Sequence, residues 1–280
     1  MKSSLLKRIL KWTLYSISIL IILILIGFLY IFRNAIYNRY VEYPREKKAW
    51  EELRKEYQPP IYDDGWEDYA GVCHSHSELS HDSQVPFEKI LQSLKQEKRQ
   101  FICMSDHCDD GKADYSKQWR GEHDGVIFIP GYEMSYGFMP WGLPPTVVLD
   151  CKKEPEPLAQ EIEQYGGLLF YAHSEEPREW DLPQLKGMEI YNIHTNFKSI
   201  DRKTLINELA PDIILNLNKY HEQLLRSIFQ PLTEVIGRWD ELNISRKIVG
   251  IGANDCHENV GFVGKITPQG KLYVEDTSPK

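Results

Sequence analysis

Short apolar runs that end in a histidine, aspartate or glutamate recur along the chain between residues 70 and 257. The runs cover residues 70–73, 101–104, 126–129, 168–172, 188–193 and 248–254. Continuous apolar runs are typical of parallel strands that are buried on both faces. The carboxyl ends of such strands meet at one edge, and enzymes with this architecture place their chemistry there. The pattern therefore predicts an α/β domain whose polar residues gather at one rim.

Segments with helical periodicity separate these runs. Residues 87–94 and 158–165 each repeat apolar side chains on one face, and Gly166 is placed to end the second helix. Residues 198–247 are mostly helical in pattern. Residues 134–146 are rich in glycine, proline and aromatic residues, which predicts a loop. That loop either shapes a pocket at the rim or packs irregularly on the domain.

The amino-terminal region carries a different pattern, because residues 12–32 contain no charge and consist mainly of isoleucine and leucine. A helix of this length crosses a bilayer, and Trp12, Tyr15 and Tyr30 lie near its ends as interfacial anchors do. A cleaved signal peptide is the alternative, but its apolar stretch is shorter and an Ala-x-Ala site follows it. We expect an uncleaved, single-span anchor whose partner is the lipid bilayer.

The expected domains are a basic tail (1–11), a transmembrane anchor (12–32), a juxtamembrane stalk (33–66) and an α/β domain (67–280). In the stalk, Trp50, Leu53 and Tyr57 form a narrow apolar stripe before Pro59 and Pro60. Either the stripe packs against the α/β domain, or the stalk is a solvated spacer. About 235 residues remain after the first ~45, enough for one domain with a sizeable core.

Positive charges flank the span almost equally. Lys2, Lys7, Arg8 and Lys11 precede it, and Arg33, Arg39, Arg45, Lys47 and Lys48 follow it. Three of the preceding residues lie within six positions of Trp12, whereas only Arg33 lies that close on the other side. Because basic residues near a span favour the cytosolic side, we predict a cytosolic amino terminus and an extracytoplasmic α/β domain.

Net charge narrows the classes of possible partner, but cysteine content does not identify the cellular compartment. The chain after residue 39 contains 27 basic and 41 acidic residues, a net charge of −14. It therefore offers no broad basic surface for a polynucleotide, and no nucleic-acid partner is expected. The five cysteines are odd in number and form no CxxC pair, so they do not resolve the compartment.

Two pairs of polar residues at strand ends indicate metal binding. His74 and His76, and likewise Asp255 and His257, are spaced i, i+2. In an extended segment such residues point to the same face, roughly 6.5 to 7 Å apart. Asp82 follows His76 closely enough to fold back as an oxygen ligand. Imidazoles and carboxylates gathered on one rim are the ligands that several divalent metal ions require.

Several segments, in their order along the chain, resemble the motifs of the PHP (polymerase and histidinol phosphatase) superfamily. The segments are His74-Ser-His76-Ser-Glu-Leu-Ser-His-Asp82, Ser105-Asp-His107, Gly131-Tyr-Glu133, Ala172-His173, Glu189-Ile-Tyr-Asn192 and Asp255-Cys-His257. The resemblance covers roughly residues 68–260. It implies a distorted (β/α)7 barrel, similar to a TIM barrel, after the transmembrane helix. It also implies two or three divalent ions (Zn, Mn or Fe) that hydrolyse phosphoesters.

The superfamily's metal ligands carry over to nine positions. They are His74, His76, Asp82, His107, Glu133, His173, His194, Asp255 and His257. The sequence departs from the commonest motifs at Ser83, Ser174, Asn254 and Cys256, which bears on substrate choice because no ligand is removed.

Four further residues near the motifs are not expected to bind metal directly. Asp106 either orients His107 from behind or caps a turn, and Asn192 is expected to support the ligands from outside their shell. Glu189 should face away from Asn192 on its strand, which makes it structural. We expect His81 to be a solvated loop residue.

The chemistry implied is hydrolysis by a water molecule that the metal ions bind and activate. A phosphomonoesterase acting on a small phosphorylated substrate is the first expectation, and a phosphodiesterase is the next. The alternatives are a membrane-tethered metal-binding module without turnover, and a metal-dependent amidohydrolase or deacetylase, because a fold does not determine its reaction.

Overall fold

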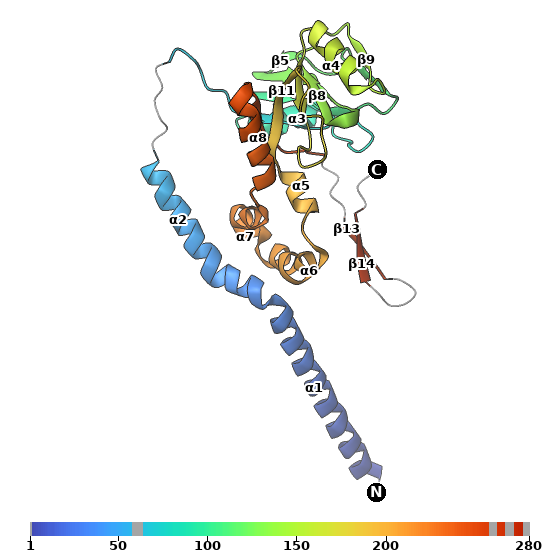
Figure 1. The fold of residues 1–280 in the computed structure, drawn as a ribbon. Coiled ribbons are helices and arrows are strands. Elements are labelled where there is room, and N and C mark those ends of the chain that lie inside the picture. The colour runs from blue at the N-terminus through green and yellow to red at the C-terminus, as the bar shows by residue number, and fades with distance from the viewer. Residues whose placement is uncertain (1, 58–63, 258–261, 267–271, 277–280) are drawn as a thin grey trace. The chain divides into compact units, whose positions relative to one another are not determined.

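The structure is a computed structural model that describes residues 2–57, 64–257, 262–266 and 272–276 (Figure 1). Backbone contacts divide the chain into two compact units. Residues 1–63 and 197–229 form the first, here called the helical unit, and residues 64–196 and 230–280 form the second, the α/β unit. Residues 197–229 thus group with the amino-terminal helices, whereas the sequence placed them within the α/β domain.

The helical unit begins with three consecutive helices, α1 (Lys2–Tyr37), the π-helix η1 (Asn38–Glu42) and α2 (Tyr43–Glu56). Within this run is a helix long and apolar enough to cross a membrane, and its apolar window has no buried residues. Trp50, Leu53 and Tyr57 are exposed by 41%, 62% and 68%, so the expected stripe is largely open to solvent. Pro59 and Pro60 lie outside the described residues.

The second part of the helical unit contains three more helices. They are α6 (Arg202–Thr204), the π-helix η3 (Leu205–Leu209) and α7 (Ala210–Ile228). Leu209, Leu224 and Ile228 form a small core here. Helix α7 contacts α1, η1 and α2, which joins the two parts of the helical unit.

The α/β unit contains two four-stranded sheets. The first has the order β1-β2-β6-β5, with β1 (Gly71–Cys73), β2 (Phe101–Cys103) and β6 (Val126–Ile129) parallel and β5 (Gly121–His123) antiparallel. The second has the order β12-β11-β10-β8, with β12 (Val249–Ala253), β11 (Leu185–Asn192) and β10 (Leu168–Tyr171) parallel and β8 (Phe138–Trp141) antiparallel.

Strand β8 corrects the prediction of a loop over residues 134–146. This segment contains the 3₁₀ helix η2 (Ser135–Gly137) and then β8, which pairs with β10. Pro140 argued against a strand in the sequence, because proline has no backbone N–H to donate to the hydrogen-bond ladder of a central strand. At the edge of the sheet, where β8 lies, proline is tolerated.

Three two-stranded pairs complete the described strands. They are β3 (Asp106–His107) with β7 (Tyr132–Glu133), β4 (Lys112–Asp114) with β9 (Val148–Asp150), and β13 (Phe262–Ile266) with β14 (Leu272–Asp276). Isolated bridges also pair Ser75 with Cys256 and Gly131 with Trp141. Among the described residues no closed barrel is found, so the structure establishes a mixed α/β architecture and the barrel stays a prediction.

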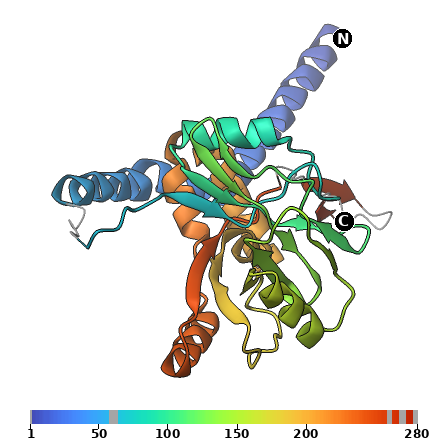
Figure 2. The same ribbon diagram turned by 90° about the horizontal axis from the view of Figure 1, so that it is seen from above.

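Helices α3 (Phe87–Gln96), α4 (Pro155–Gln164) and α8 (Thr233–Ser245) lie outside the strands of the α/β unit (Figure 2). Helix α3 contacts β6, α4 contacts β10 and α8 contacts β11. Leu158 and Ile162 of α4 are fully buried, and Phe87, Ile90 and Leu94 of α3 are nearly so. The helices predicted over 87–94 and 158–165 are therefore confirmed.

Candidate metal centre

Eight of the nine predicted ligands lie at the carboxyl ends of strands or just beyond them, and the ninth lies in a loop. His74 and His76 follow β1, His107 ends β3, Glu133 ends β7, His173 follows β10, His194 lies in α5 (Ile193–Lys198), and Asp255 and His257 follow β12. Asp82 comes from the loop between β1 and α3. The structure brings these side chains into four overlapping groups. Within each group the candidate ligand atoms lie within 4.8 Å of one another.

Three of these residues adopt backbone conformations that are rare outside glycine. The φ angles of His74, His173 and Asp255 are 62°, 46° and 50°. The sequence predicted extended segments in which alternation would orient the side chains. Instead, the strands end and left-handed residues turn the side chains inward. Such a conformation costs of order 1–3 kcal/mol per residue and clusters at functional sites.

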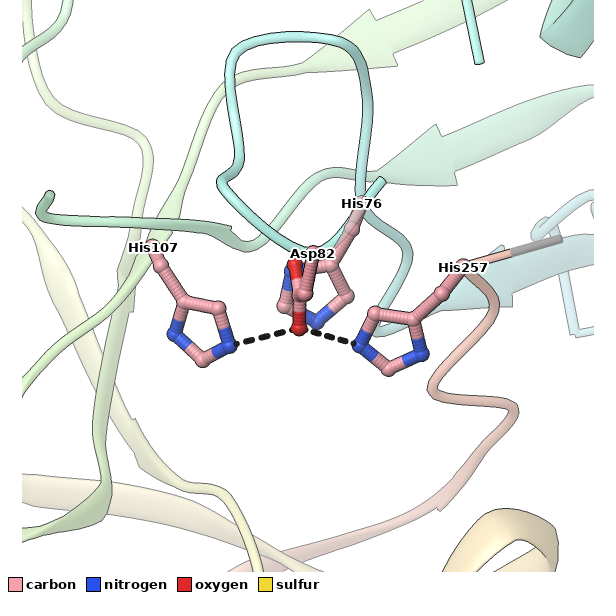
Figure 3. Close-up of side chains that lie close together, drawn as sticks. All are labelled: His76, Asp82, His107 and His257. Atoms are coloured by element: carbon pink, nitrogen blue, oxygen red, sulfur yellow. Dashed lines mark ion pairs between the residues drawn. The ribbon is translucent and has the colours of Figure 1, made fainter. Parts of the chain in front are cut away.

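The first group consists of His76, Asp82, His107 and His257 (Figure 3). Asp82 Oδ2 lies 3.2 Å from His107 Nε2 and 3.0 Å from His257 Nε2. The rings of His76 and His257 stack with their centroids 4.2 Å apart. Asp82 Oδ1 is buried and makes no hydrogen bond within the described part of the chain.

Glu133 lies at the centre of a second group. Its Oε2 atom lies 3.2 Å from His74 Nε2 and 3.6 Å from His76 Nε2. Its Oε1 atom lies 3.2 Å from His173 Nε2. The Nε2 atoms of His74 and His76 face each other at 3.1 Å. One carboxylate thus contacts these three imidazoles, which come from two strand ends.

The Asp255 carboxylate contacts five histidines. Its Oδ1 atom lies 3.4 Å from both His74 Nε2 and His76 Nε2, and 3.2 Å from His257 Nε2. Its Oδ2 atom lies 2.8 Å from His194 Nδ1 and 3.6 Å from His173 Nε2. Asp255 therefore belongs to two of the groups, as a carboxylate that bridges neighbouring cations would, whereas Glu133 belongs to one group and also contacts His173 of another.

The donor set fits divalent metal ions. Every ion pair that Asp82, Glu133 and Asp255 make in the described part of the chain is with a histidine, and none is with lysine or arginine. Buried charges are normally paired or coordinate a metal. Cations at the centre would satisfy the buried carboxylates, the facing imidazole nitrogens and Asp82 Oδ1, which makes no hydrogen bond in the described part of the chain. The clusters could hold metal ions.

The electrostatics of the cluster point the same way. Burial raises the pKa of Glu133, but the charge of His74 and hydrogen bonds from His173 and His74 outweigh it, so the pKa falls well below its usual range. Burial lowers the pKa of His173, but hydrogen bonds to Glu133 and Glu175 raise it to about 10. The carboxylates thus remain ionised and draw positive charge to their surroundings, whether as protons or as metal ions.

Glu189 is a site residue that the sequence reasoning missed. Its Oε1 atom contacts His74 Nδ1, and its Oε2 atom accepts hydrogen bonds from His173 N at 2.8 Å and from Asn192 Nδ2 at 3.1 Å. Simple alternation would place Glu189 and Asn192 on opposite faces of β11. A register shift between Glu189 and Tyr191 removes that constraint. A buried glutamate inside an apolar run was the available signal, since such a group needs partners.

Two other polar residues hold the loop that carries His76. Ser80 Oγ lies 3.1 Å from His76 Nδ1 and accepts a hydrogen bond from His107 N at 2.9 Å. Asp106 accepts hydrogen bonds from Ser77 N and Gln118 Nε2, both at 2.6 Å. Asp106 thus fixes the backbone after His76. Neither of the two expected roles, orienting His107 or capping a turn, included this contact.

A cavity of about 560 Å³ adjoins the cluster, with His107 and Glu133 on its wall. Lys152 and His81 also line it, and His81 Nδ1 pairs with Asp109. A disulfide joins Cys108, directly after His107, to Cys151, directly after β9, and both cysteines line the cavity. The sequence had left the cysteine pairing open.

Comparison with known proteins adds no relative from which a function can be transferred: no protein-family model matches the chain, and no curated protein matches it.

Proposed function

We propose that the protein is a membrane-anchored, metal-dependent phosphoesterase of the PHP type. The observation that carries the proposal is the convergence of nine candidate nitrogen and oxygen ligands around the carboxylates of Asp82, Glu133 and Asp255. One ion cannot use that many ligands, whereas two or three can share them. The same positions match the superfamily motifs in order along the chain.

We also propose that the strands form a distorted barrel. The parallel bridge between Ser75 and Cys256 joins β1 of the first sheet to β12 of the second on one side. The bridge between Gly131 and Trp141, together with contacts between β7 and β8, joins them on the other. Contacts on both sides support a ring of strands with the ligands at one end.

Two or three ions would be held by four overlapping groups of candidate ligands. The groups are His76, Asp82, His107 and His257; His74, His76 and Glu133; His74, His173 and Asp255; and His194, Asp255 and His257. Divalent zinc, manganese or iron suits such imidazole–carboxylate sets. When bound, these ions would lower the pKa of water and offset the charge of the phosphoryl group.

The chain's own residues prepare the site for that chemistry. Glu189 and Ser80 hold the Nδ1 atoms of His74 and His76, so that each ring presents its Nε2 atom to the centre. The adjoining cavity can admit a small substrate between His107 and Lys152. The ammonium group of Lys152, exposed at the cavity, attracts an anionic substrate such as a phosphate ester.

The test uses the full-length protein in detergent with Mn²⁺ or Zn²⁺ and a panel of substrates. We expect hydrolysis of an aryl phosphomonoester, slower hydrolysis of a phosphodiester, and loss of both with chelator. Elemental analysis should find two or three metal ions per chain. His173→Ala should abolish turnover and lower metal content, whereas His221→Ala, exposed in α7, should change neither.

Each part of the proposal has an outcome that contradicts it. One metal ion or none would rule out a multinuclear site. Metal binding without turnover of any substrate would favour a binding module. Cleavage of an acetylated sugar but of no phosphoester would keep the site and reject the substrate class. Equal losses in His173→Ala and His221→Ala would mean that the ligands are folding residues.

The disulfide supports an orientation for this enzyme. Disulfides persist in oxidising compartments and are rare in the cytosol. The link between Cys108 and Cys151 therefore supports the orientation predicted from the flanking charges, with the amino terminus in the cytosol and the α/β unit outside. Substrates would then be extracytoplasmic phosphoesters.

A further inference from the structure

The first half of α7 is fastened to α1 immediately beyond the predicted membrane span. Asn216 Nδ2 donates a hydrogen bond to Ala35 O at 3.0 Å, and Arg39 Nη1 donates to Leu215 O. Ala35 is only three residues past Phe32, where the apolar stretch ends. At the helical rise of 1.5 Å per residue, that distance is about 4.5 Å. If residues 12–32 span the bilayer, residues 215 and 216 lie at its surface.

A buried polar network makes this attachment specific. The Asp212 carboxylate is 5% exposed and accepts hydrogen bonds from Asn38 Nδ2, Tyr43 Oη and Asn216 Nδ2. These donors come from α7, η1 and α2. Removing α7 would leave Tyr43 and Asn38 without their acceptor, so the helices hold a fixed relation to one another.

The second half of α7 contacts the chain much farther from the span. Arg226 pairs with Glu46, and Glu222 Oε2 lies 3.1 Å from Arg54 Nη2. Glu46 is 14 residues beyond Phe32, which corresponds to about 20 Å along the helical path. The headgroup layer on each side of a bilayer is only about 5–7 Å thick. The two halves of α7 therefore lie at different depths.

The half that lies near the span exposes large apolar side chains. Ile214 is 70% exposed and Leu217 is 45% exposed. On the neighbouring turns of α1 and η1, Tyr37 is 53% exposed and Tyr40 is 73% exposed. Isoleucine and leucine gain free energy by leaving water, and tyrosine is enriched where an apolar layer meets water.

We propose that the start of α7, together with Tyr37 and Tyr40, docks on the lipid surface, with Ile214 and Leu217 entering the headgroup region. The occupant of this surface is the bilayer that the anchor itself crosses, because the hydrogen bonds that Ala35 accepts and Arg39 donates hold the surface beside it. The proposal rests on the membrane span but not on hydrolysis. Its consequence is that the membrane fixes the helical unit at two places, the span and this surface.

The test compares two exposed positions of one helix in the full chain. A photoreactive diazirine amino acid replaces Ile214 or Leu225, which are 70% and 48% exposed. A third variant carries it at Leu23, inside the span. Each protein is reconstituted in vesicles of phosphatidylcholine and phosphatidylglycerol, irradiated, and analysed by intact mass for lipid adducts. Thermal unfolding of each variant checks that it folds as the parent does.

We expect strong lipid adducts at position 23, and several-fold more adduct at position 214 than at position 225. Adducts at 23 with equal, low yields at 214 and 225 would overturn the surface docking while leaving the span intact. Crosslinks at 214 to a second copy of the chain would assign the surface to self-association instead. None of these yields depends on turnover, so failure here is distinguishable from failure of the proposed phosphoesterase.

Discussion

At the scale of single residues, the cluster is arranged by groups that do not themselves face its centre. Glu189 contacts His74 Nδ1 and His173 N, and it is 1% exposed. An ionised carboxylate behind a ligating histidine sets the tautomer and increases the basicity of the opposite nitrogen. The Glu189 carboxylate contacts two candidate ligands that follow different strands. Its charge and its shape therefore both affect the geometry of the cluster.

The first prediction concerns that charge. Glu189→Gln keeps the size of the side chain but removes the negative charge beside His74, and we expect metal affinity to fall about 10- to 100-fold. Competition with a chelating dye measures the affinity. Glu163→Gln is the matched control, because Glu163 pairs with Lys186 on the surface, 3.4 Å away. Lower thermal stability with unchanged metal affinity would reduce Glu189 to a structural role.

The clustering of the nine candidate ligands was predictable from the sequence, because short motifs place their side chains near strand ends, and the structure gathers those positions together. The contacts of Glu189 were not predictable, because the register shift in β11 is set by pairing with β12. Such pairing depends on residues about 60 positions away in the chain, which no local periodicity reports. The left-handed conformations of His74 and Asp255 were not predicted either, because histidine and aspartate adopt them more often than most residues but still only in a minority of cases.

At the scale of elements, helices with a buried apolar face were predictable and elements held by polar contacts were not. Helices α3 and α4 followed from apolar side chains at helical spacing. The grouping of α7 with α1 depends on Asp212, Asn216 and Asn38, which in a sequence resemble ordinary surface residues. A polar residue announces a buried network only once its partners are known.

The second prediction tests that network. Asp212→Ala leaves the buried Tyr43 hydroxyl without this acceptor and the Asn216 amide with only Ala35 O, and an unsatisfied buried group costs about 1–3 kcal/mol. We expect α7 to detach, seen as faster limited proteolysis within residues 197–229. Glu208→Ala, an exposed acidic residue of η3, should leave the digestion pattern unchanged. Identical patterns for both variants would show that apolar packing alone holds α7.

At the scale of the whole molecule, the charges around the proposed anchor and the disulfide favour the same orientation. The flanking charges alone are nearly balanced, and their nearness to the span favours a cytosolic amino terminus. The disulfide is an independent argument, because Cys108 and Cys151 belong to the α/β unit and need an oxidising compartment. The metal ions would then be acquired outside the cytosol.

The last prediction is this orientation. Protease added to intact cells or spheroplasts should remove a carboxyl-terminal tag and spare an amino-terminal one, because only the α/β unit is outside. Permeabilised samples, treated with a thiol-reactive polymer without reduction, should show Cys108 and Cys151 protected; after reduction both should react. The variant with serine at both positions controls for the other three cysteines, Cys73, Cys103 and Cys256. A carboxyl-terminal tag that resists protease until the membrane is permeabilised, with Cys108 and Cys151 then reactive without reduction, would place the α/β unit in the cytosol.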